Sequence, residues 1–403
     1  MNIAELARAA GRIALDTEFM GEGRYRTLLC LVQLAVAEPA DGTGNTGSED
    51  GEHPKEGHER IEILDPLREE WLRQPLAEAI ADPAVELVVH AGRQDIALLR
   101  RALGCEVRNV FDTQVAAGFL GMGAQCSYDT LLAELLGVKL SKSASFTRWD
   151  ARPLTGEQLD YARDDVVHLS ALAIELQHRL DKVGRLRWAR EECEFLERVS
   201  DERNLDAIFE RLPRVRSLNA ASQGVARELV AWRERMAAER DRPVQSVLGD
   251  AALVEIAKRK PSSPRKLQDI RGVGQGSLRR GGEDLLAAVQ RGLESSHPPL
   301  AGGPRTAPPR PDDAPLIALA EALVRARARE ADVAYELLAS RADLQAIVAV
   351  RRDARAGRDS RGEADVRTLR GWRRELVGEE LLALLDGRMS LSVQDARLQI
   401  DPI

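Results

Sequence analysis

The stretch Arg12-Ile-Ala-Leu-Asp-Thr-Glu-Phe19 decides the fold of the first part of this chain. Its three apolar residues before the first acidic one have β character and predict a buried strand. Asp16 and Glu18 follow, and because a strand alternates its faces, the two carboxylates point to the same side. Neighbouring carboxylates repel each other, and a hard divalent cation with oxygen ligands relieves that repulsion. In a chain with 65 acidic residues such a pair also arises by chance, so residues further along decide the interpretation.

The composition is typical of a soluble globular protein with two or three domains. The chain has 403 residues, of which 44% are apolar and 31% are charged, so each domain can bury a core of its own. The four cysteines are scattered without a paired spacing, which argues against a zinc site or a disulfide framework. The N-terminus has no signal-peptide pattern, and no apolar run is long enough to cross a bilayer. We therefore expect a cytoplasmic protein.

Apolar periodicity predicts an α/β domain at the start of the chain. Short apolar runs predict strands at residues 12–17, 28–37, 61–64 and 85–89. Amphipathic patterns predict helices at residues 2–10, 71–80, 93–103, 112–121, 128–136 and 156–183. Residues 38–60 are acidic, rich in glycine and without aromatics, so we expect a flexible surface loop there. Strands followed by strands that alternate with helices favour a mixed sheet with flanking helices.

The second half of the chain is expected to be helical. We find no strand pattern after about residue 184, and helical patterns lie on both sides of a linker rich in proline and glycine at residues 294–315. Residues 211–293 hold 17 basic and 9 acidic residues, a net charge of +8 in a chain whose total is −7. A basic module in an acidic chain suggests polyanion binding, although a charged helix face that keeps the module soluble has the same composition.

Two further segments supply carboxylates that complete a pattern. The fourth predicted strand runs into His90-Ala-Gly-Arg-Gln-Asp95, where Asp95 lies at the start of a helix. An aspartate in that position is also a common helix cap. In the segment 159–168, Tyr161 and Asp165 are four residues apart and therefore share one face of a helix.

These residues together resemble the DEDD exonuclease superfamily, in the subtype that uses tyrosine. The carboxylates occur in the order Asp16, Glu18, Asp95 and Asp165, with Tyr161 four residues before the last. The match to the bacterial ribonuclease D family includes the motifs "ALDTEF", "VVHAGRQD", "YARDDVVHL", "FDTQVAAGFLG" (111–121) and "KSASFTRWDARPLTGEQL" (142–159). Two helical segments resemble the helicase-and-RNase-D C-terminal (HRDC) domain, at residues 228–274 and, in a more divergent form, 369–387.

The resemblance implies an α/β ribonuclease-H-like exonuclease domain followed by two small all-α domains. The implied divisions are residues 1–185 for the DEDD 3′–5′ exonuclease domain, 186–217 for a connecting helical segment, 218–293 for the first HRDC-like domain, 294–315 for the linker and 316–403 for the second HRDC-like domain. Gln94 and Arg148 depart from the family pattern, because acidic residues are common at both positions. Neither belongs to the set of four carboxylates.

The resemblance further implies a 3′–5′ exoribonuclease that releases 5′-mononucleotides by two-metal hydrolysis, with Mg²⁺ or Mn²⁺ as the cofactor. Two cations about 3.5–4 Å apart neutralise a phosphodiester and clamp its attacking and leaving oxygens. Asp16 is expected to bridge both ions, and Glu18 and Asp165 to hold the ion that carries the attacking water. Asp95 is expected to help fix the second ion, and Tyr161 to orient the attacking water.

Residues that contact the substrate are expected around the site and in the basic module. His90 and Gln94 either line the pocket or support it, Lys142 or Arg152 could meet a phosphate, and Trp149 could stack on a base or simply pack. Weaker candidates near the second strand are Tyr25, Arg26 and Gln33. In the basic module, six basic residues cluster within fourteen positions: Lys258, Arg259, Lys260, Arg265, Lys266 and Arg271.

The expected partner is RNA with a free 3′ end, in particular a tRNA precursor, without a membrane or a required protein partner. Two alternatives stay open: a 3′–5′ DNA exonuclease with the same chemistry, and a nucleic-acid-binding protein whose nuclease site is inactive. The complete set of carboxylates and Tyr161 counts against the second, whereas selection of RNA over DNA depends on pocket geometry. If the basic module supplies affinity for long RNA, a chain ending near residue 210 should still cut a short oligonucleotide.

Overall fold

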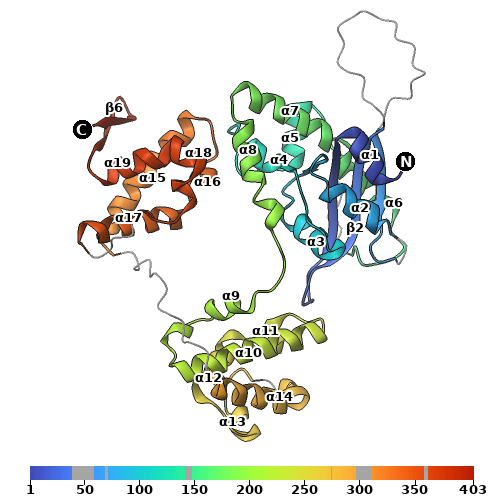
Figure 1. Cartoon of the computed structure of the whole chain (residues 1–403), viewed down its shortest axis with the longest axis vertical. Helices are drawn as coiled ribbons and strands as arrows, with labels where there is room; N and C mark the ends of the chain where they lie inside the picture. Colours follow the sequence, from blue (N-terminus) through green and yellow to red (C-terminus); the bar gives the residue numbers. More distant parts are fainter. Residues whose placement is uncertain (39–58, 69–70, 141–147, 274, 296–309, 358–361) are drawn as a thin grey trace, which may run out of the picture.

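The computed structural model describes residues 1–38, 59–68, 71–140, 148–273, 275–295, 310–357 and 362–403. Most of the predicted loop 38–60 and of the linker 294–315 therefore lies outside the described residues. Figure 1 shows three bodies, namely an N-terminal domain built on a sheet and two helical modules. Within the described parts of the chain, every helix is too short or too polar to span a bilayer.

A mixed sheet forms the centre of the N-terminal domain, as predicted, and it has five strands. The strand order is β3-β2-β1-β4-β5. The β1–β2 and β2–β3 pairs are antiparallel, whereas the β1–β4 and β4–β5 pairs are parallel. The strands are β1 (Arg12–Met20), β2 (Leu28–Ala37), β3 (Glu59–Leu64), β4 (Glu86–Val89) and β5 (Val110–Asp112). Strand β5 was not predicted from the sequence, because its three residues merge with the helical pattern that follows.

Helices cover both faces of this sheet. Alternate residues of β1 serve the two faces: Ile13 and Leu15 join one buried cluster with helices α1 to α3, and Ala14 joins another with α4 and α7. Helix α6 packs over β2 and β3. The helices are α1 (Ile3–Ala10), α2 (Arg73–Ala81), α3 (Arg93–Leu103), α4 (Thr113–Gly118), α5 (Tyr128–Leu131), η1 (Leu132–Leu136), α6 (Gly156–Val167) and α7 (Leu169–Lys182).

The single helix predicted for residues 156–183 is in fact two helices. The chain leaves helical geometry at His168, whose φ is −111° and ψ is 2°. A capping box of Thr155 and Gln158 fixes the start of α6. The break allows α6 to pack over β2 and β3 while α7 packs against β1 and β4.

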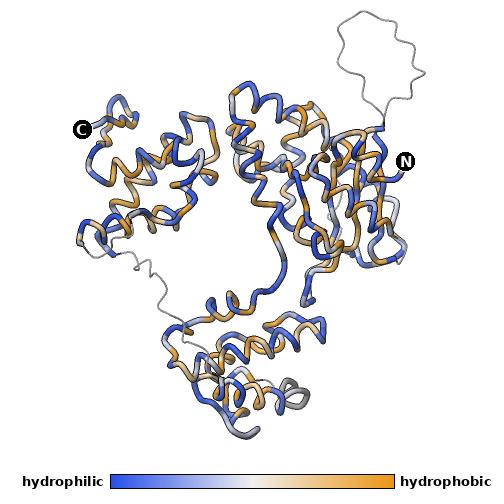
Figure 2. The backbone as a smooth tube through the Cα atoms, in the orientation of Figure 1, coloured by the Kyte–Doolittle hydropathy of each residue, from blue (hydrophilic) through white to orange (hydrophobic). Residues whose placement is uncertain are grey.

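A connecting segment leads into the first helical module. It contains α8 (Leu186–Cys193), η2 (Leu196–Arg198), α9 (Leu205–Glu210) and η3 (Val215–Ser217). The module consists of α10 (Ala220–Glu239), α11 (Val244–Val247), α12 (Asp250–Arg259), α13 (Pro264–Gln268) and α14 (Gln275–Glu294). Helix α10 has 20 residues, whereas α14 consists of two helical stretches that meet at a kink at Gly281. Orange and blue alternate along the helices in Figure 2, as expected of helices that bury one face.

The hairpin between β1 and β2 contacts the first helical module. The Tyr25 hydroxyl donates a hydrogen bond of 3.1 Å to the buried carboxylate of Glu234 on α10. Arg203 forms an ion pair with the same carboxylate. Arg24 pairs with Asp241 at 2.7 Å. Tyr25 therefore takes part in the packing of domains, and the substrate role considered from the sequence stays a prediction.

The second helical module repeats part of the order of the first. A long helix, a four-residue helix and a third helix follow one another as α15, α16 and α17, like α10, α11 and α12. A β-hairpin ends the chain, which the sequence analysis did not predict. The elements are α15 (Asp313–Glu330), α16 (Tyr335–Leu338), α17 (Arg341–Arg355), η4 (Arg367–Leu369), α18 (Gly371–Arg373), η5 (Arg374–Gly378), α19 (Glu379–Leu385), β6 (Met389–Gln394) and β7 (Arg397–Pro402).

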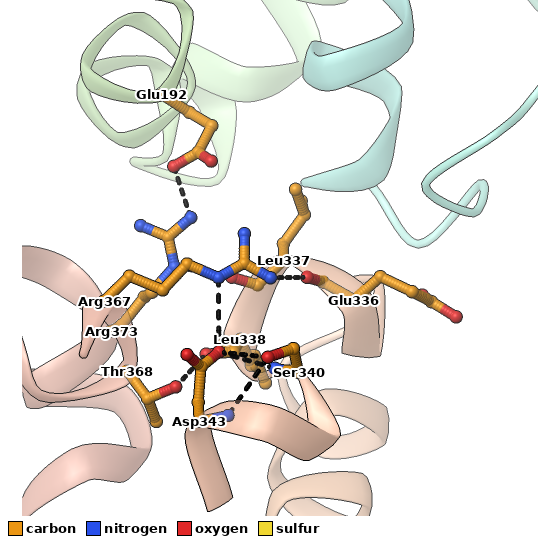
Figure 3. Close-up of polar contacts among 9 residues, drawn as sticks. All are labelled: Glu192, Glu336, Leu337, Leu338, Ser340, Asp343, Arg367, Thr368 and Arg373. Carbon is orange, nitrogen blue, oxygen red and sulfur yellow. Dashed lines mark hydrogen bonds and ion pairs between the residues drawn. The ribbon is translucent and has the colours of Figure 1, made fainter. Parts of the chain in front are cut away.

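The second module is joined to the N-terminal domain and α8 through both apolar and polar contacts. The side chain of Trp372, only 1% exposed, packs edge-on against Phe119 at a centroid distance of 4.9 Å. The amide of Ala334 donates to the carbonyl of Gly118 at 2.8 Å. Figure 3 shows Arg373 reaching Glu192 of α8 while its Nε donates to a carbonyl of its own module. Residues of both bodies thus share one buried cluster.

Candidate metal and catalytic site

Three carboxylates from two elements meet beside residues 16–18 of β1. Asp16 and Glu18 lie on the same face of the strand, and Asp165 comes from the last turn of α6. One oxygen from each of the three lies within 4.8 Å of the others. All three residues are partly buried, so water reaches the cluster only in part. The fold therefore brings together residues that are about 150 positions apart in the chain.

Asp95 reaches the same region from the opposite face of the sheet. It is the third residue of α3 and is buried, and it accepts a hydrogen bond from the hydroxyl of Thr17. Its carboxylate does not belong to the group of three, although Asp95 is close enough to raise the pKa of Asp16 and of Glu18. The helix cap is Gly92, so Asp95 does not act as the N-cap that its position suggested.

The turn before Asp95 is held by a residue that the sequence analysis missed. Asp112, at the end of β5, accepts hydrogen bonds from the amides of Ala91 and Gly92 at 3.1 and 2.9 Å. It also caps α4 by accepting from Gln114. Burial raises the pKa of Asp112, and these backbone donors act in the opposite direction. The signal was present in the sequence, because an aspartate between a strand and a helix is a favoured N-cap.

Without a cation, burial and mutual repulsion disfavour the ionised form of these carboxyl groups and raise their pKa values. Burial, with the carboxylates of Asp165 and Asp95, raises the pKa of Glu18 to about 8. Burial is also the largest cause that raises the pKa of Asp165, to about 7. The pKa of Asp16 rises for the same two reasons. A donor set of carboxylate oxygens that is short of positive charge fits a hard divalent cation.

Tyr161 lies one helical turn before Asp165 on α6, with its ring near Trp149 at a centroid distance of 6.0 Å. A hydrogen bond from Tyr161 lowers the pKa of Asp165, opposing the effect of burial. The phenol pKa of Tyr161 is raised by burial and by the neighbouring carboxylates. Tyr161 is therefore protonated at neutral pH and can donate a hydrogen bond at the edge of the carboxylate cluster.

His90 supports the site, and Gln94 is exposed beside it. The hydroxyl of Thr113 donates to the carbonyl of Val89 at 3.1 Å and lies 2.9 Å from Nδ1 of His90. Burial lowers the pKa of His90 to about 4, so its imidazole is neutral. Gln94 is solvent-exposed in the first turn of α3.

Of the candidate substrate-binding residues before α6, Arg152 and Trp149 make contacts within the protein. Arg152 forms an ion pair with Asp65 at 2.6 Å and donates to the carbonyl of Cys30 at 2.9 Å. Its donors thus join the loop to β2 and to the segment after β3, and contact between Arg152 and a phosphate stays a prediction. Trp149 is 3% exposed and packs in the core, which favours packing over base stacking. Lys142 lies outside the described residues.

The basic residues of the first helical module lie on and around α12 and α13. They occupy the end of α12, the turn after it, α13 and the turn before α14. Five of them are solvent-exposed and Lys260 is partly exposed. Arg259 pairs with Glu255 at 2.5 Å, and Lys266 donates to the hydroxyl of Ser262 at 3.2 Å. These six cations lie on a different body from the carboxylate cluster.

Comparisons with known proteins agree with this arrangement. Residues 1–181 match a family model described as 3′-5′ exonuclease, and residues 222–289 match the HRDC domain. The chain is 36% identical to ribonuclease D of Granulibacter bethesdensis, over 96% of this chain and 91% of that protein. It is 35% identical to ribonuclease D of Gluconacetobacter diazotrophicus, over 99% and 94%. The crystal structure of Escherichia coli RNase D superposes with a TM-score of 0.74 at 26% identity, covering 96% of each chain.

The fold, the acidic cluster and the comparisons lead to the same conclusion. The exonuclease fold together with the cluster of Asp16, Glu18 and Asp165 implies dependence on a divalent metal. The relatives match over nearly the whole length of the chain, helical modules included. This chain therefore belongs to the ribonuclease D family and is a 3′–5′ exoribonuclease.

Proposed function

We propose that this enzyme shortens RNA from its 3′ end by two-metal hydrolysis and releases 5′-mononucleotides. The observation that carries the proposal is the meeting of Asp16, Glu18 and Asp165, whose oxygens lie within 4.8 Å of one another. When bound, two Mg²⁺ or Mn²⁺ ions would neutralise the phosphodiester and activate the attacking water. We assign Asp16 to both ions, Glu18 and Asp165 to one of them, and Asp95 to the other.

The remaining residues of the site orient and protect the reacting groups. Tyr161 keeps its proton, so it donates a hydrogen bond to orient the attacking water rather than acting as the main base. Thr17 holds the carboxylate of Asp95. Neutral His90 and Thr113 stabilise the turn between β4 and α3.

We assign RNA affinity to the basic module and the chemistry to the exonuclease domain. The module presents exposed basic side chains around α12 and α13, whereas the carboxylate cluster attracts metal rather than phosphate. Binding to many phosphates at a distance from the reacting end suits a long or folded RNA. The E. coli relative is described as involved in structured RNA processing. We propose tRNA precursors with a free 3′ end as the substrate, in the cytoplasm, where the four free cysteines stay reduced.

We also propose that the chain has two HRDC-like modules, at residues 218–293 and 316–403, after an exonuclease domain at residues 1–185. The helix order shared by α10–α12 and α15–α17 supports the second module. The segment 186–217 connects the first two bodies, and 294–315 links the modules.

One experiment tests the proposed function. Matched 3′-labelled and 5′-labelled RNA and DNA oligonucleotides, and a tRNA precursor with a 3′ extension, are incubated with Mg²⁺, Mn²⁺ or EDTA. We expect labelled mononucleotides from RNA, a ladder of shortened 5′-labelled products, and no reaction in EDTA. Faster cleavage of DNA than of RNA would favour the alternative of a DNA exonuclease. Internal cleavage products would contradict the exonuclease assignment.

A further inference from the structure

Gln33 is a fully buried amide beside the central carboxylate of the site. It lies on β2 directly opposite Asp16 in the antiparallel register, and its exposed fraction is 0%. Its Nε2 donates a hydrogen bond of 2.7 Å to Oδ2 of Asp16. Glutamine is seldom fully buried in proteins. The contact thus links a neighbouring strand directly to the residue assigned to both metal ions.

The other half of this amide has no hydrogen-bond partner. Among the residues that the structure describes, Oε1 of Gln33 is buried and accepts no hydrogen bond. Reversing the amide would place Oε1 against the carboxylate of Asp16, where two acceptors would face each other. The amide orientation is therefore set by Asp16, through a single hydrogen bond.

A buried glutamine with an unpaired amide oxygen lowers the free energy of unfolding relative to an apolar residue at this position. On β2, the neighbours of Gln33 on the same face of the strand are Leu31 and Ala35, both fully buried and apolar. A buried polar atom without a partner costs free energy that a leucine at this position would avoid. Local choices that oppose stability are found mainly at functional sites. The contact with Asp16 is the feature that leucine cannot supply.

A neutral donor suits a carboxylate that must bind cations. The charged groups that raise the pKa of Asp16 are Asp95, Asp165 and Glu18, all of them acidic. A lysine or arginine in place of Gln33 would neutralise Asp16 and compete with the metal for it. An amide N–H holds one oxygen in place and leaves the negative charge of the carboxylate available.

We propose that Gln33 is a positioning residue that fixes the carboxylate of Asp16 for metal binding. The inference rests on the proposed metal-dependent function and deepens it. Nε2 holds Oδ2, which restricts rotation of the Asp16 side chain and directs its remaining acceptor sites toward Glu18 and Asp165. Such supporting hydrogen bonds orient direct ligands and tune their affinity for the metal.

The test uses Gln33→Leu and Gln33→Glu in the full chain. Leucine removes the donor and packs well, whereas glutamate keeps the shape but replaces the donor with an acceptor. Mn²⁺ binding without RNA is followed by electron paramagnetic resonance, and steady-state cleavage of RNA gives kcat and KM. We expect Mn²⁺ affinity to fall about 10–100-fold and kcat to fall with it, while KM stays unchanged. The thermal midpoint of Gln33→Leu in EDTA should equal or exceed that of the parent.

A matched control is Gln223→Leu. Gln223 is also a buried glutamine, but its Nε2 donates to the carbonyl of Leu218 in the first helical module. This variant should bind Mn²⁺ like the parent.

If both Gln33 variants bind Mn²⁺ and cleave RNA like the parent, Gln33 is an ordinary core residue and the inference is wrong. If Gln33→Leu fails to fold, the Mn²⁺ affinity of Gln33→Glu decides alone. If the parent protein itself binds no Mn²⁺, the proposed metal-dependent function is contradicted, and the inference about Gln33 falls with it.

Discussion

The indole ring of Trp372 stacks on that of Trp188, with the ring centroids 5.3 Å apart and the planes inclined by 18°. Trp372 belongs to the second helical module and Trp188 to α8, which follows the exonuclease sheet domain. Removal of the Trp372 side chain should leave a cavity and lower the free energy of unfolding by about 3–5 kcal/mol. Denaturant unfolding measures the loss. The exposed Leu316→Ala is the control, and an equal effect there would contradict a specific role for Trp372.

This contact changes the expectation for a shortened chain. A chain ending near residue 210 would expose Phe119 and Trp188, which pack against the second module. We therefore expect that fragment to be less stable than the whole protein, with a lower thermal midpoint. The prediction from the sequence, that it should still cut a short oligonucleotide, needs a folded fragment. Binding by the basic module is better tested by substitutions in the full chain.

Asp16→Asn tests the centre of the carboxylate cluster. The change removes the charge but keeps the size, and the fold should survive because repulsion with Glu18 and Asp165 is relieved. Changes around metal ligands typically cost 10–100-fold, so we expect loss of a direct ligand to lower turnover by more than about 100-fold. RNA cleavage in Mg²⁺ and thermal unfolding in EDTA measure the two effects. Asp160→Asn, which changes an exposed carboxylate on α6, the helix that carries Asp165, should leave both unchanged.

The raised pKa values predict how stability depends on pH. In the folded protein the pKa of Glu18 is about 8 and that of Asp165 is about 7, both above the ordinary value of a carboxyl. Between about pH 4 and 8 the folded state without metal binds more protons than the unfolded state, so its stability should fall as pH rises. A bound cation favours the ionised carboxylates, and the gain in thermal midpoint from Mg²⁺ should therefore grow with pH.

Thermal unfolding at pH 5, 6, 7 and 8, in EDTA and in Mg²⁺, measures both trends. Glu18→Gln serves as the control, because it removes the group with the pKa of about 8 and should flatten the dependence in EDTA. A parent protein whose stability in EDTA rises steadily from pH 5 to 8, with the same slope in Glu18→Gln, would rule out a charge-limited cluster.

Tyr161→Phe keeps the ring next to Trp149 and deletes only the hydroxyl. Stability should change by about 1 kcal/mol, the value of one hydrogen bond. Metal and RNA binding should persist, and turnover should fall roughly 10²–10⁴-fold if the hydroxyl orients the attacking water. Single-turnover rates at saturating Mg²⁺ measure the effect, with Tyr335→Phe in the second helical module as the control. Cleavage at the parent rate would show that the hydroxyl has no catalytic role.

Substitution of Lys260 and Arg265 by glutamine tests the basic module. Each lost phosphate contact should weaken binding and lower the slope of log affinity against log salt by about 0.7 for a single strand. Binding of a tRNA-sized RNA at several salt concentrations measures the slope, and cleavage of a short oligonucleotide should be unaffected. The control replaces Lys182 and Arg187, two exposed basic residues outside the module. Equal losses in both double variants would show that binding depends on total charge alone.

The sequence by itself determined the exonuclease sheet and the identity of the acidic residues. The alternation in Arg12–Phe19 places Asp16 and Glu18 on one face, and the spacing of four residues places Tyr161 beside Asp165. Both inferences depend on local backbone periodicity, which is a property of the chain itself. The three-residue β5 and the C-terminal hairpin escaped this reasoning, because short or mostly exposed strands carry little apolar pattern.

Only the tertiary structure decided which partners these residues have. Thr17 holds Asp95 across 78 positions, Arg152 pairs with Asp65 across 87, and Arg373 reaches Glu192 across 181. Nothing in the local pattern distinguishes an arginine that pairs with a carboxylate from one that is free to bind phosphate. The choice depends on strand register and on how helices pack, because side-chain hydrogen bonds form only where the folded backbone brings donor and acceptor within about 3 Å.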